Sequence, residues 1–200
     1  GVSIIARSIA TFSSNSRIAA VRAVIHFDDM HLYEDAVKGL SSSKLLEPVQ
    51  GGTTRQQSVY LGLQSLKNIS PDQVLIHDAA RPFVSTGMIN SIIGELKSSR
   101  GAIVAIPVYD TLKSSNDFFI SSTIDRSSLW CAQTPQGFHY EDIYQAYAIC
   151  GETELTDDAA VFEKQNIPIK LVEGTADNIK ITSREDLMRA ERVIGNWEFR

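Results

Sequence analysis

The first half of the chain alternates between apolar positions at helical spacing and short apolar runs. Ile5, Ile9 and Phe12 recur at the spacing of one helix face, and Ser3 is placed to cap that helix, which is predicted over 4–12. The run 19–26 shows little alternation, as is typical of a parallel strand covered on both faces. Further strands are predicted at 45–49, 74–77 and 102–108, and further helices from 28, after 52 and over 85–98. This order predicts an α/β domain with a largely parallel sheet.

The segment 110–126 departs from this alternation. Its Ser, Thr and Asn content around Asn116-Asp117, between two short β-prone stretches, predicts a protruding β-hairpin, and such an arm needs a partner surface. After it, strands are predicted at 129–133, 169–172 and 178–182, and helices at 141–150 and 156–165. Ser183 and Asp186 fit a capping box for a last helix. No repeat or linker interrupts 1–200, so one domain is expected.

Composition narrows the function classes. The 19 basic and 24 acidic residues give a net charge of −5, which argues against sequence-independent binding of nucleic acid. No stretch approaches the ~18–20 apolar residues of a membrane span. Cys131 and Cys150 form no metal or redox motif, which favours a reduced, cytoplasmic protein without thiol chemistry. The chain enters a helix directly after Gly1, whereas α/β domains normally open on a strand, so an N-terminal piece is expected to be missing.

Candidate chemistry lies after the strands, where ligands of α/β sheets gather. The predicted strand 74–77 runs into Asp78 and Arg81, and Asp78 could hold Mg²⁺ on the phosphates of a nucleotide. The alternative is an Asp that caps the next turn with Arg81 as its surface partner, and this segment alone favours neither. None of the four histidines has metal-ligand spacing, and His77 is expected in the sheet with its ring hydrogen-bonded.

Two other segments have polar residues that suit a phosphate. Gly51-Gly52 joins a strand to a helix, so free N–H groups there could receive a phosphate, ribose or base, although a tight turn with positive φ is the commoner explanation. No Walker loop and no GxGxxG occurs. Lys180 lies in an apolar stretch, where an inward cation needs an anion, although lysines on strand edges often face solvent. Arg126 and Thr134, taken singly, favour structural roles.

Taken together and in order, several short segments form a more specific pattern. They are Gly51-Gly52 with Arg55 and Ser58, HDAARP at 77–82, PVYDTLK at 107–113, Asp125-Arg126, Leu129-Trp130, QTPQ at 133–136, TDDA at 156–159 and DNIKIT at 177–182. This series, which covers nearly the whole chain, resembles the 2-C-methyl-D-erythritol 4-phosphate cytidylyltransferase family.

The resemblance implies a Rossmann-like three-layer nucleotidyltransferase fold, in which a sugar-alcohol phosphate attacks the α-phosphorus of CTP and expels pyrophosphate with the help of Mg²⁺. It implies catalytic roles for Lys180 and Arg126, and a homodimer in which the arm 110–126 reaches the neighbouring subunit's site. The implied substrate-binding residues are Thr111, Arg126, Thr134, Thr156 and Lys180, and the implied nucleotide-binding residues are Gly51, Gly52, Ser58, Asp78 and Arg81, with Asp78 also meeting the metal.

The chain also departs from the family pattern. The family's first strand, its glycine-rich loop and a P-K-Q segment, which carry cations for the triphosphate, are expected before Gly1. Thr53 replaces an acidic residue common in relatives, and 197–200 resembles a junction to a fused cyclodiphosphate synthase domain. Two alternatives stay open: a ribitol 5-phosphate cytidylyltransferase, and a non-catalytic nucleotide-binding or dimerisation module.

Overall fold

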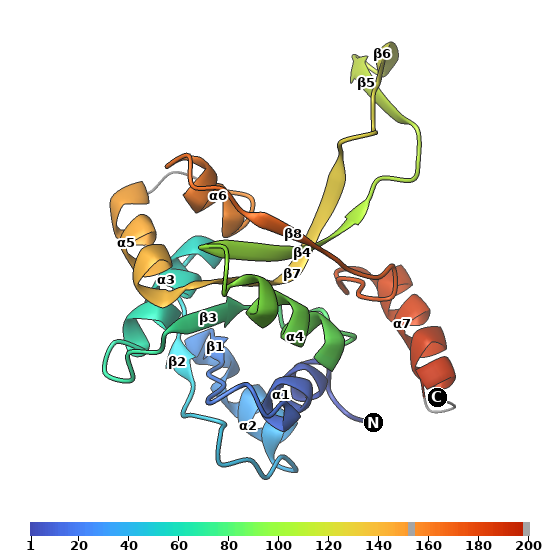
Figure 1. The fold of residues 1–200 in the computed structure, drawn as a ribbon. Coiled ribbons are helices and arrows are strands. Elements are labelled where there is room, and N and C mark those ends of the chain that lie inside the picture. The colour runs from blue at the N-terminus through green and yellow to red at the C-terminus, as the bar shows by residue number, and fades with distance from the viewer. Residues whose placement is uncertain (152–154, 198–200) are drawn as a thin grey trace.

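The computed structural model describes residues 1–151 and 155–197, and Figure 1 shows the arrangement of its elements. The helices are α1 (Ile4–Ser14), α2 (Met30–Val37), α3 (Arg55–Ser65), α4 (Thr86–Glu95), α5 (Tyr140–Cys150), α6 (Ala159–Glu163) and α7 (Arg184–Trp197), with the 3₁₀ turn η1 (Phe27–Asp29). The strands are β1 (Val24–Ile25), β2 (Val49–Gln50), β3 (Gln73–Ile76), β4 (Gly101–Pro107), β5 (Leu112–Asn116), β6 (Phe119–Ile124), β7 (Trp130–His139) and β8 (Lys170–Glu173).

The main sheet has the strand order β3-β7-β4-β8. Strand β7 is antiparallel to both β3 and β4, whereas β8 is parallel to β4, so β3, β4 and β8 run in one direction and β7 runs against them. The sheet is therefore mixed, where the sequence predicted a largely parallel one. The reason is the connection: the chain leaves β4, forms a hairpin and returns directly, and a parallel neighbour would need a crossover.

The N-terminal strands are shorter than predicted. Val24–Ile25 pairs in parallel with Val49–Gln50, and an isolated bridge joins Val21 to Leu45. The predicted strand 178–182 is wrong: its backbone makes turn contacts, including Ile179 N to Asp177 O at 2.7 Å, and Ile181 N donates to Ala80 O at 2.8 Å. This segment follows β8 as a loop that lies against the loop after β3.

Strand β4 separates two helical layers, because its side chains alternate between the two faces of the sheet. Ala102 and Val104 pack with Met88, Ile92 and Leu96 of α4 on one face. Ile103 packs on the other face with Phe138 of β7 and with residues of α3, α5 and α6, among them Leu63, Ile143, Tyr147, Val161 and Phe162. The result is the three-layer α/β arrangement that the resemblance implies, with the ends of β3 and β8 left open to loops (Figure 1).

Two predicted helix caps are confirmed. The Ser3 hydroxyl accepts from Ala6 N–H at 3.2 Å. At α7, Ser183 N–H donates to Asp186 Oδ2 at 3.0 Å and Asp186 N–H donates to Ser183 Oγ at 3.1 Å, which is a complete capping box. Among the helices within 1–151 and 155–197, none combines the length and apolar character needed to cross a bilayer.

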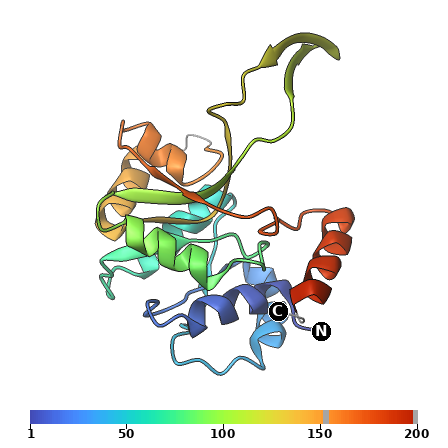
Figure 2. The same ribbon diagram turned by 45° about the vertical axis from the view of Figure 1, so that its right-hand side comes forward.

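Strands β5 and β6 form an antiparallel hairpin that extends away from the sheet (Figures 1 and 2). Asp117 and Phe118 form its turn with φ values of 47° and 66°. Every residue of β6 is exposed, and Phe118 at the turn is fully exposed. The side-chain hydrogen bonds of β5 and β6 join the two strands of the hairpin, as between Lys113 Nζ and Thr123 Oγ1 at 2.6 Å.

Candidate functional site

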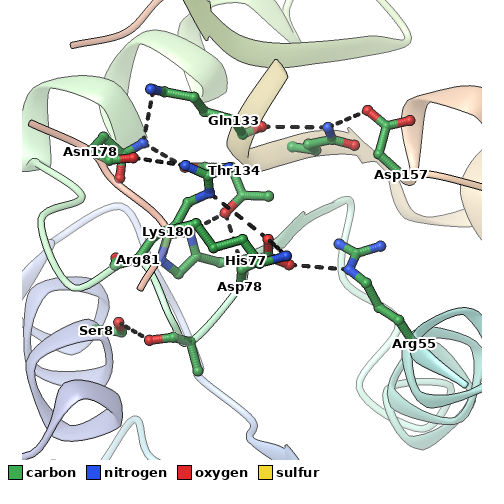
Figure 3. A network of polar contacts seen from close by, with 12 residues as sticks. Ser8, Arg55, His77, Asp78, Arg81, Gln133, Thr134, Asp157, Asn178 and Lys180 are labelled. Carbon is green, nitrogen blue, oxygen red and sulfur yellow. Dashed lines mark hydrogen bonds and ion pairs between the residues drawn. The ribbon is translucent and has the colours of Figure 1, made fainter. Parts of the chain in front are cut away.

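Asp78 lies at the centre of a group of charged side chains beyond the end of β3. Its carboxylate is largely buried and has three cations around it. Arg55 Nε lies 3.1 Å from Oδ1, Lys180 Nζ lies 3.0 Å from Oδ2, and Arg81 Nε lies 3.8 Å from Oδ2. Figure 3 shows Asp78 between Arg55 and Lys180. We call Arg55, Asp78, Arg81 and Lys180 the Asp78 cluster.

The cations of this cluster keep Asp78 ionised. Burial by itself raises the pKa of the Asp78 carboxyl, but the charges and hydrogen bonds of Arg55 and Lys180 outweigh it, so the pKa lies below its ordinary value. Burial has the opposite effect on Arg81, whose pKa it lowers. Because guanidinium groups titrate far above neutrality, Arg81 stays charged.

Arg55 connects the cluster to the region before α6. Its guanidinium donates to both oxygens of Asp158, with distances of 3.1 and 2.6 Å, and Asp158 is fully buried. The Tyr147 hydroxyl also donates to Asp158. Burial lowers the pKa of Arg55. The hydrogen bonds and charge of Asp158 raise this pKa by more than burial lowers it, so the net shift is upward. Three cations against the carboxylates of Asp78 and Asp158 leave one net positive charge, which suits an anionic ligand.

Lys180 reaches Asp78 from the loop after β8. The loop is fixed from both sides: Ile181 N–H donates to Ala80 O at 2.8 Å, and Arg81 Nη1 donates to Asn178 O at 2.8 Å. The sequence predicted a phosphate as the anion beside an inward Lys180, and the structure instead places the Asp78 carboxylate next to its ammonium. The Lys180 side chain is still 42% exposed, so its ammonium remains accessible from solvent.

A buried polar network lies next to the cluster (Figure 3). Thr134 is buried, and its hydroxyl accepts from Asp78 N–H at 3.0 Å and bonds with His77 Nδ1 at 2.9 Å. Asn178 Nδ2 donates to Thr134 O at 2.9 Å and to Gln133 Oε1 at 3.1 Å. The Thr134 hydroxyl therefore makes its hydrogen bonds to other groups of the protein, next to Asp78.

Gly51 and Gly52 owe their identity to close packing. Neither has a positive φ, since Gly151 is the only glycine with one among the described residues, so a positive-φ turn at this pair is ruled out. A Cβ at Gly51 would lie 2.7 Å from Ser58 Oγ, and one at Gly52 would lie 2.4 Å from Gln57 Cβ. Ser58 Oγ accepts from Gly52 N–H at 3.1 Å, which holds the glycines against the start of α3. Arg55 on that helix then joins this segment to Asp78.

The remaining predicted site residues have no recorded contact with the cluster. Thr111 and Arg126 are exposed at the base of the hairpin, where the Arg126 guanidinium donates to Tyr109 O. Thr156 is exposed and precedes Asp157, whose Oδ2 accepts from Gln136 Nε2 at 2.8 Å. The structure thus gathers Asp78, Arg81, Thr134 and Lys180, and leaves the hairpin residues apart.

Sequence reasoning gave no role to Arg55 and Asp158, although both belong to the motifs quoted for the resemblance. Their pairing spans 103 positions along the chain. The available signal was an Arg opening a helix and an Asp preceding another helix, and neither pattern shows that the two side chains meet.

The donor set at Asp78 is small for a metal. Within the described residues there is no group of three or more His, Cys, Asp or Glu side chains that could hold a metal ion. Asp78 provides one carboxylate, already next to cations. It therefore fits an ion that takes most of its ligands from water and substrate, as Mg²⁺ does on nucleotide phosphates.

Known proteins of similar fold and sequence show the family of this chain. The fold is that of a cytidylyltransferase: a crystal structure of 4-diphosphocytidyl-2C-methyl-D-erythritol synthase from Anaerococcus prevotii superposes with a TM-score of 0.86 at 30% identity, covering 96% of this chain and 86% of that one. A sequence model of the 2-C-methyl-D-erythritol 4-phosphate cytidylyltransferase family matches residues 1–196, and the chain belongs to that family.

Among curated relatives, the bifunctional enzyme IspD/IspF of Paramagnetospirillum magneticum is 52% identical over 95% of this chain and 49% of its own length. The bifunctional enzyme IspD/IspF of Rhodospirillum rubrum is 48% identical over 96% of this chain and 50% of its own length. The chain therefore spans about half the length of these relatives. The predicted junction at 197–200 lies outside the described residues except for the end of α7 at Trp197.

Proposed function

We propose that this chain transfers CMP from CTP to 2-C-methyl-D-erythritol 4-phosphate in non-mevalonate isoprenoid synthesis, in the cytoplasm. The observation that carries the proposal is the Asp78 cluster, a partly exposed group with net positive charge at the strand ends of a member of this family. A phosphate oxygen of the sugar alcohol attacks the α-phosphorus of CTP. One P–O bond forms, the bond to the β-phosphate oxygen breaks, and pyrophosphate leaves with the electron pair.

Lys180 is the residue we assign to the attacking phosphate. Its ammonium is accessible and is held in place by Asp78. Charge develops on the phosphoryl oxygens during transfer, and a preorganised cation lowers the free energy of that state more than that of the bound substrates. Arg81 adds a second cation, which together with Asp78 faces the nucleotide.

The cytidine side of the pocket is assigned to Gly51, Gly52 and Ser58. Gly51 and Gly52 precede α3, and Ser58 lies one turn after Arg55 on that helix, so a nucleoside bound there would have its phosphates near the cluster. Thr134 is assigned to the sugar phosphate side only indirectly, through Asp78, whose N–H its hydroxyl holds, and Thr156 is assigned there through its exposure beside Asp157.

Mg²⁺ is assigned to the same place. When bound, the ion would neutralise charge on the triphosphate and stabilise the departing pyrophosphate. Asp78 would supply one oxygen ligand, and the phosphates and water would supply the rest. Lys180 and Arg55 keep that carboxylate ionised and therefore able to coordinate.

The hairpin supports a homodimer in which the arm 110–126 completes the neighbouring subunit's site. Phe118, Phe119 and Ile120 are 105%, 79% and 69% exposed, and apolar groups gain free energy when another surface covers them. We assign Thr111 and Arg126 to the sugar phosphate of the partner subunit. Arg126 carries its positive charge on a long side chain that is exposed at the base of the arm. It has no carboxylate partner among the described residues.

The test is pyrophosphate release by the full encoded protein that contains residues 1–200. CTP with 2-C-methyl-D-erythritol 4-phosphate should give rapid release that depends on Mg²⁺, and CTP with ribitol 5-phosphate should give little. Preference for ribitol 5-phosphate would overturn the substrate assignment. Absence of release with either alcohol phosphate, from protein that still binds CTP, would support a non-catalytic nucleotide-binding module instead.

A further inference from the structure

His77 lies beneath the Asp78 cluster, immediately after β3. Its Nε2 is 3.1 Å from Arg81 O, its Nδ1 is 2.9 Å from Thr134 Oγ1, and its ring lies 5.0 Å from that of Phe12. Burial lowers the pKa of the imidazole to about 4, so the ring is neutral near pH 7.

The partners of His77 fix which ring nitrogen carries the proton. A carbonyl oxygen can only accept, so Nε2 must be the N–H that donates to Arg81 O. In a neutral ring Nδ1 is then an acceptor, and the Thr134 hydroxyl donates to it. That hydroxyl has its lone pairs left for Asp78 N–H, which donates to it at 3.0 Å. The three hydrogen bonds therefore have a single consistent direction.

These bonds hold both ends of the loop 78–81. Arg81 is bound through its carbonyl, and Asp78 is bound through its N–H by way of Thr134. Asp78, which bonds Lys180, and Arg81, whose guanidinium lies beside the Asp78 carboxylate, are thus both linked to one imidazole. The loop has one internal bond besides, from Arg81 N–H to Asp78 O at 2.9 Å.

We propose that His77 is a positioning residue for nucleotidyl transfer, and that its Nε2–H, acting with Thr134, sets the orientation of Asp78 and Arg81. This inference rests on the proposed function. It assigns His77 no contact with substrate: the imidazole acts through the backbone of the loop. Partners that orient directly acting side chains are typically worth about 10- to 100-fold in activity.

The tautomer is tested first, without any assay of activity. In the full encoded protein with ¹⁵N-labelled histidine, the His77 ring should give the nitrogen shifts of the Nε2–H tautomer at about pH 8. An Nδ1–H tautomer would overturn the proposal whatever the enzyme's substrate is.

Kinetics then separate positioning from packing. His77→Phe keeps an aromatic ring and removes both hydrogen bonds, and it should lower kcat about 10- to 100-fold. The control is His139→Phe, because His139 Nε2 also bonds a backbone carbonyl, Leu96 O at 3.0 Å, at the opposite end of β3. His139→Phe should leave kcat within about twofold of wild type. An equal loss of kcat in both variants would mean that His77 serves the fold alone.

A double-mutant cycle tests the role of Thr134. Thr134→Val should reduce kcat, and Thr134→Ser, which retains the hydroxyl, should recover most of it. If the hydroxyl acts through His77, Thr134→Val should cost little more in the His77→Phe background. Fully additive losses would show that Thr134 and His77 act separately, and would overturn the shared path. If wild-type protein releases no pyrophosphate, the proposed function fails, while the nitrogen shifts still decide the tautomer.

Discussion

The Asp78 cluster and the β5–β6 hairpin are both rich in polar side chains, yet these side chains bond to different kinds of partner in the two regions. In the cluster, each charged group contacts residues far away in the sequence: Arg55 bonds Asp78 and Asp158, and Lys180 bonds Asp78. In the hairpin, the side-chain bonds join neighbours across one turn, as between Ser114 and Ser122 at 2.6 Å. The cluster is therefore preorganised within one chain, whereas the hairpin's large apolar side chains remain exposed.

The two regions therefore suit different functions. Cations fixed by carboxylates need no reorganisation when an anion binds, which suits a site for charge stabilisation. An exposed hairpin with an apolar turn gains most from a second surface. Substitutions in the cluster should therefore change activity or stability directly, and those in the hairpin should act through assembly.

The largest effect is expected at Lys180. In the full encoded protein, Lys180→Ala should lower kcat about 10²- to 10³-fold, because it removes a preorganised cation from the reacting phosphate. The melting temperature should change little, since the side chain is 42% exposed and Asp78 keeps Arg55. Steady-state pyrophosphate release and thermal melts measure the two quantities.

Lys170→Ala is the matched control for that experiment. Lys170 is an exposed lysine on β8, outside the cluster, and its removal should leave both quantities near wild type. A sharp fall in melting temperature for Lys180→Ala, with a normal rate for the folded fraction, would make Lys180 a structural residue.

The next effect concerns stability. Arg55→Met should lower the free energy of unfolding by about 3–5 kcal/mol, because it leaves the fully buried Asp158 carboxylate without its cation. The hairpin substitution Lys113→Met removes a hydrogen bond to Thr123 and should change stability by less than about 0.5 kcal/mol. Urea unfolding measures both. Similar values for the two variants would show that the cluster is no more tightly built than the hairpin.

Acid should weaken the region around the cluster through His77. The imidazole pKa is 6.5 ordinarily and about 4 in the folded protein, so between these values the unfolded chain binds more protons. The contribution of His77 to the free energy of unfolding is then fully present above pH 6.5. It falls as the pH drops toward 4, by on the order of 3 kcal/mol in total. Relative to His77→Phe, wild type should lose this stability as the pH falls in urea titrations. A constant difference between wild type and His77→Phe would contradict the shift.

Local patterns predicted the local structure well. The helix predicted over 85–98 forms over Thr86–Glu95 with Ser85 as its cap, and the capping box of Ser183 and Asp186 forms as expected. The motif order also led to the right family and brought attention to Asp78 and Lys180. These features are set by spacing and capping within a few residues, which a sequence displays directly.

Features that depend on distant partners could not be predicted in the same way. The sequence did not reveal that β7 runs antiparallel between β3 and β4, since strand direction depends on how the hairpin returns. The apolar stretch 178–182 looked like a strand, but its backbone bonds go to turns and to the loop after β3. The contact between Arg55 and Asp158 likewise exists only in the folded chain.

The last prediction tests whether the hairpin acts across a subunit interface. If Lys180 serves its own subunit's pocket and Arg126 serves its neighbour's, Lys180→Ala and Arg126→Ala should each be weak as homodimers. A mixed dimer then has one pocket with both defects and one with neither. Random exchange makes about half of the dimers mixed, so about a quarter of wild-type sites should reappear when the two variants are refolded together.

The control for this mixture is Lys180→Ala refolded with Asp78→Asn. These two side chains lie 3.0 Å apart in one subunit, so every pocket of a mixed dimer carries one defect and no activity should return. Pyrophosphate release is compared with each variant refolded alone, and mass spectrometry confirms that mixed dimers form. Recovery in both mixtures would point to rescue by refolding alone. If neither mixture recovers activity although mixed dimers are present, Arg126 does not act on the neighbouring site. The exposed hairpin and the preorganised cluster would then belong to separate functions.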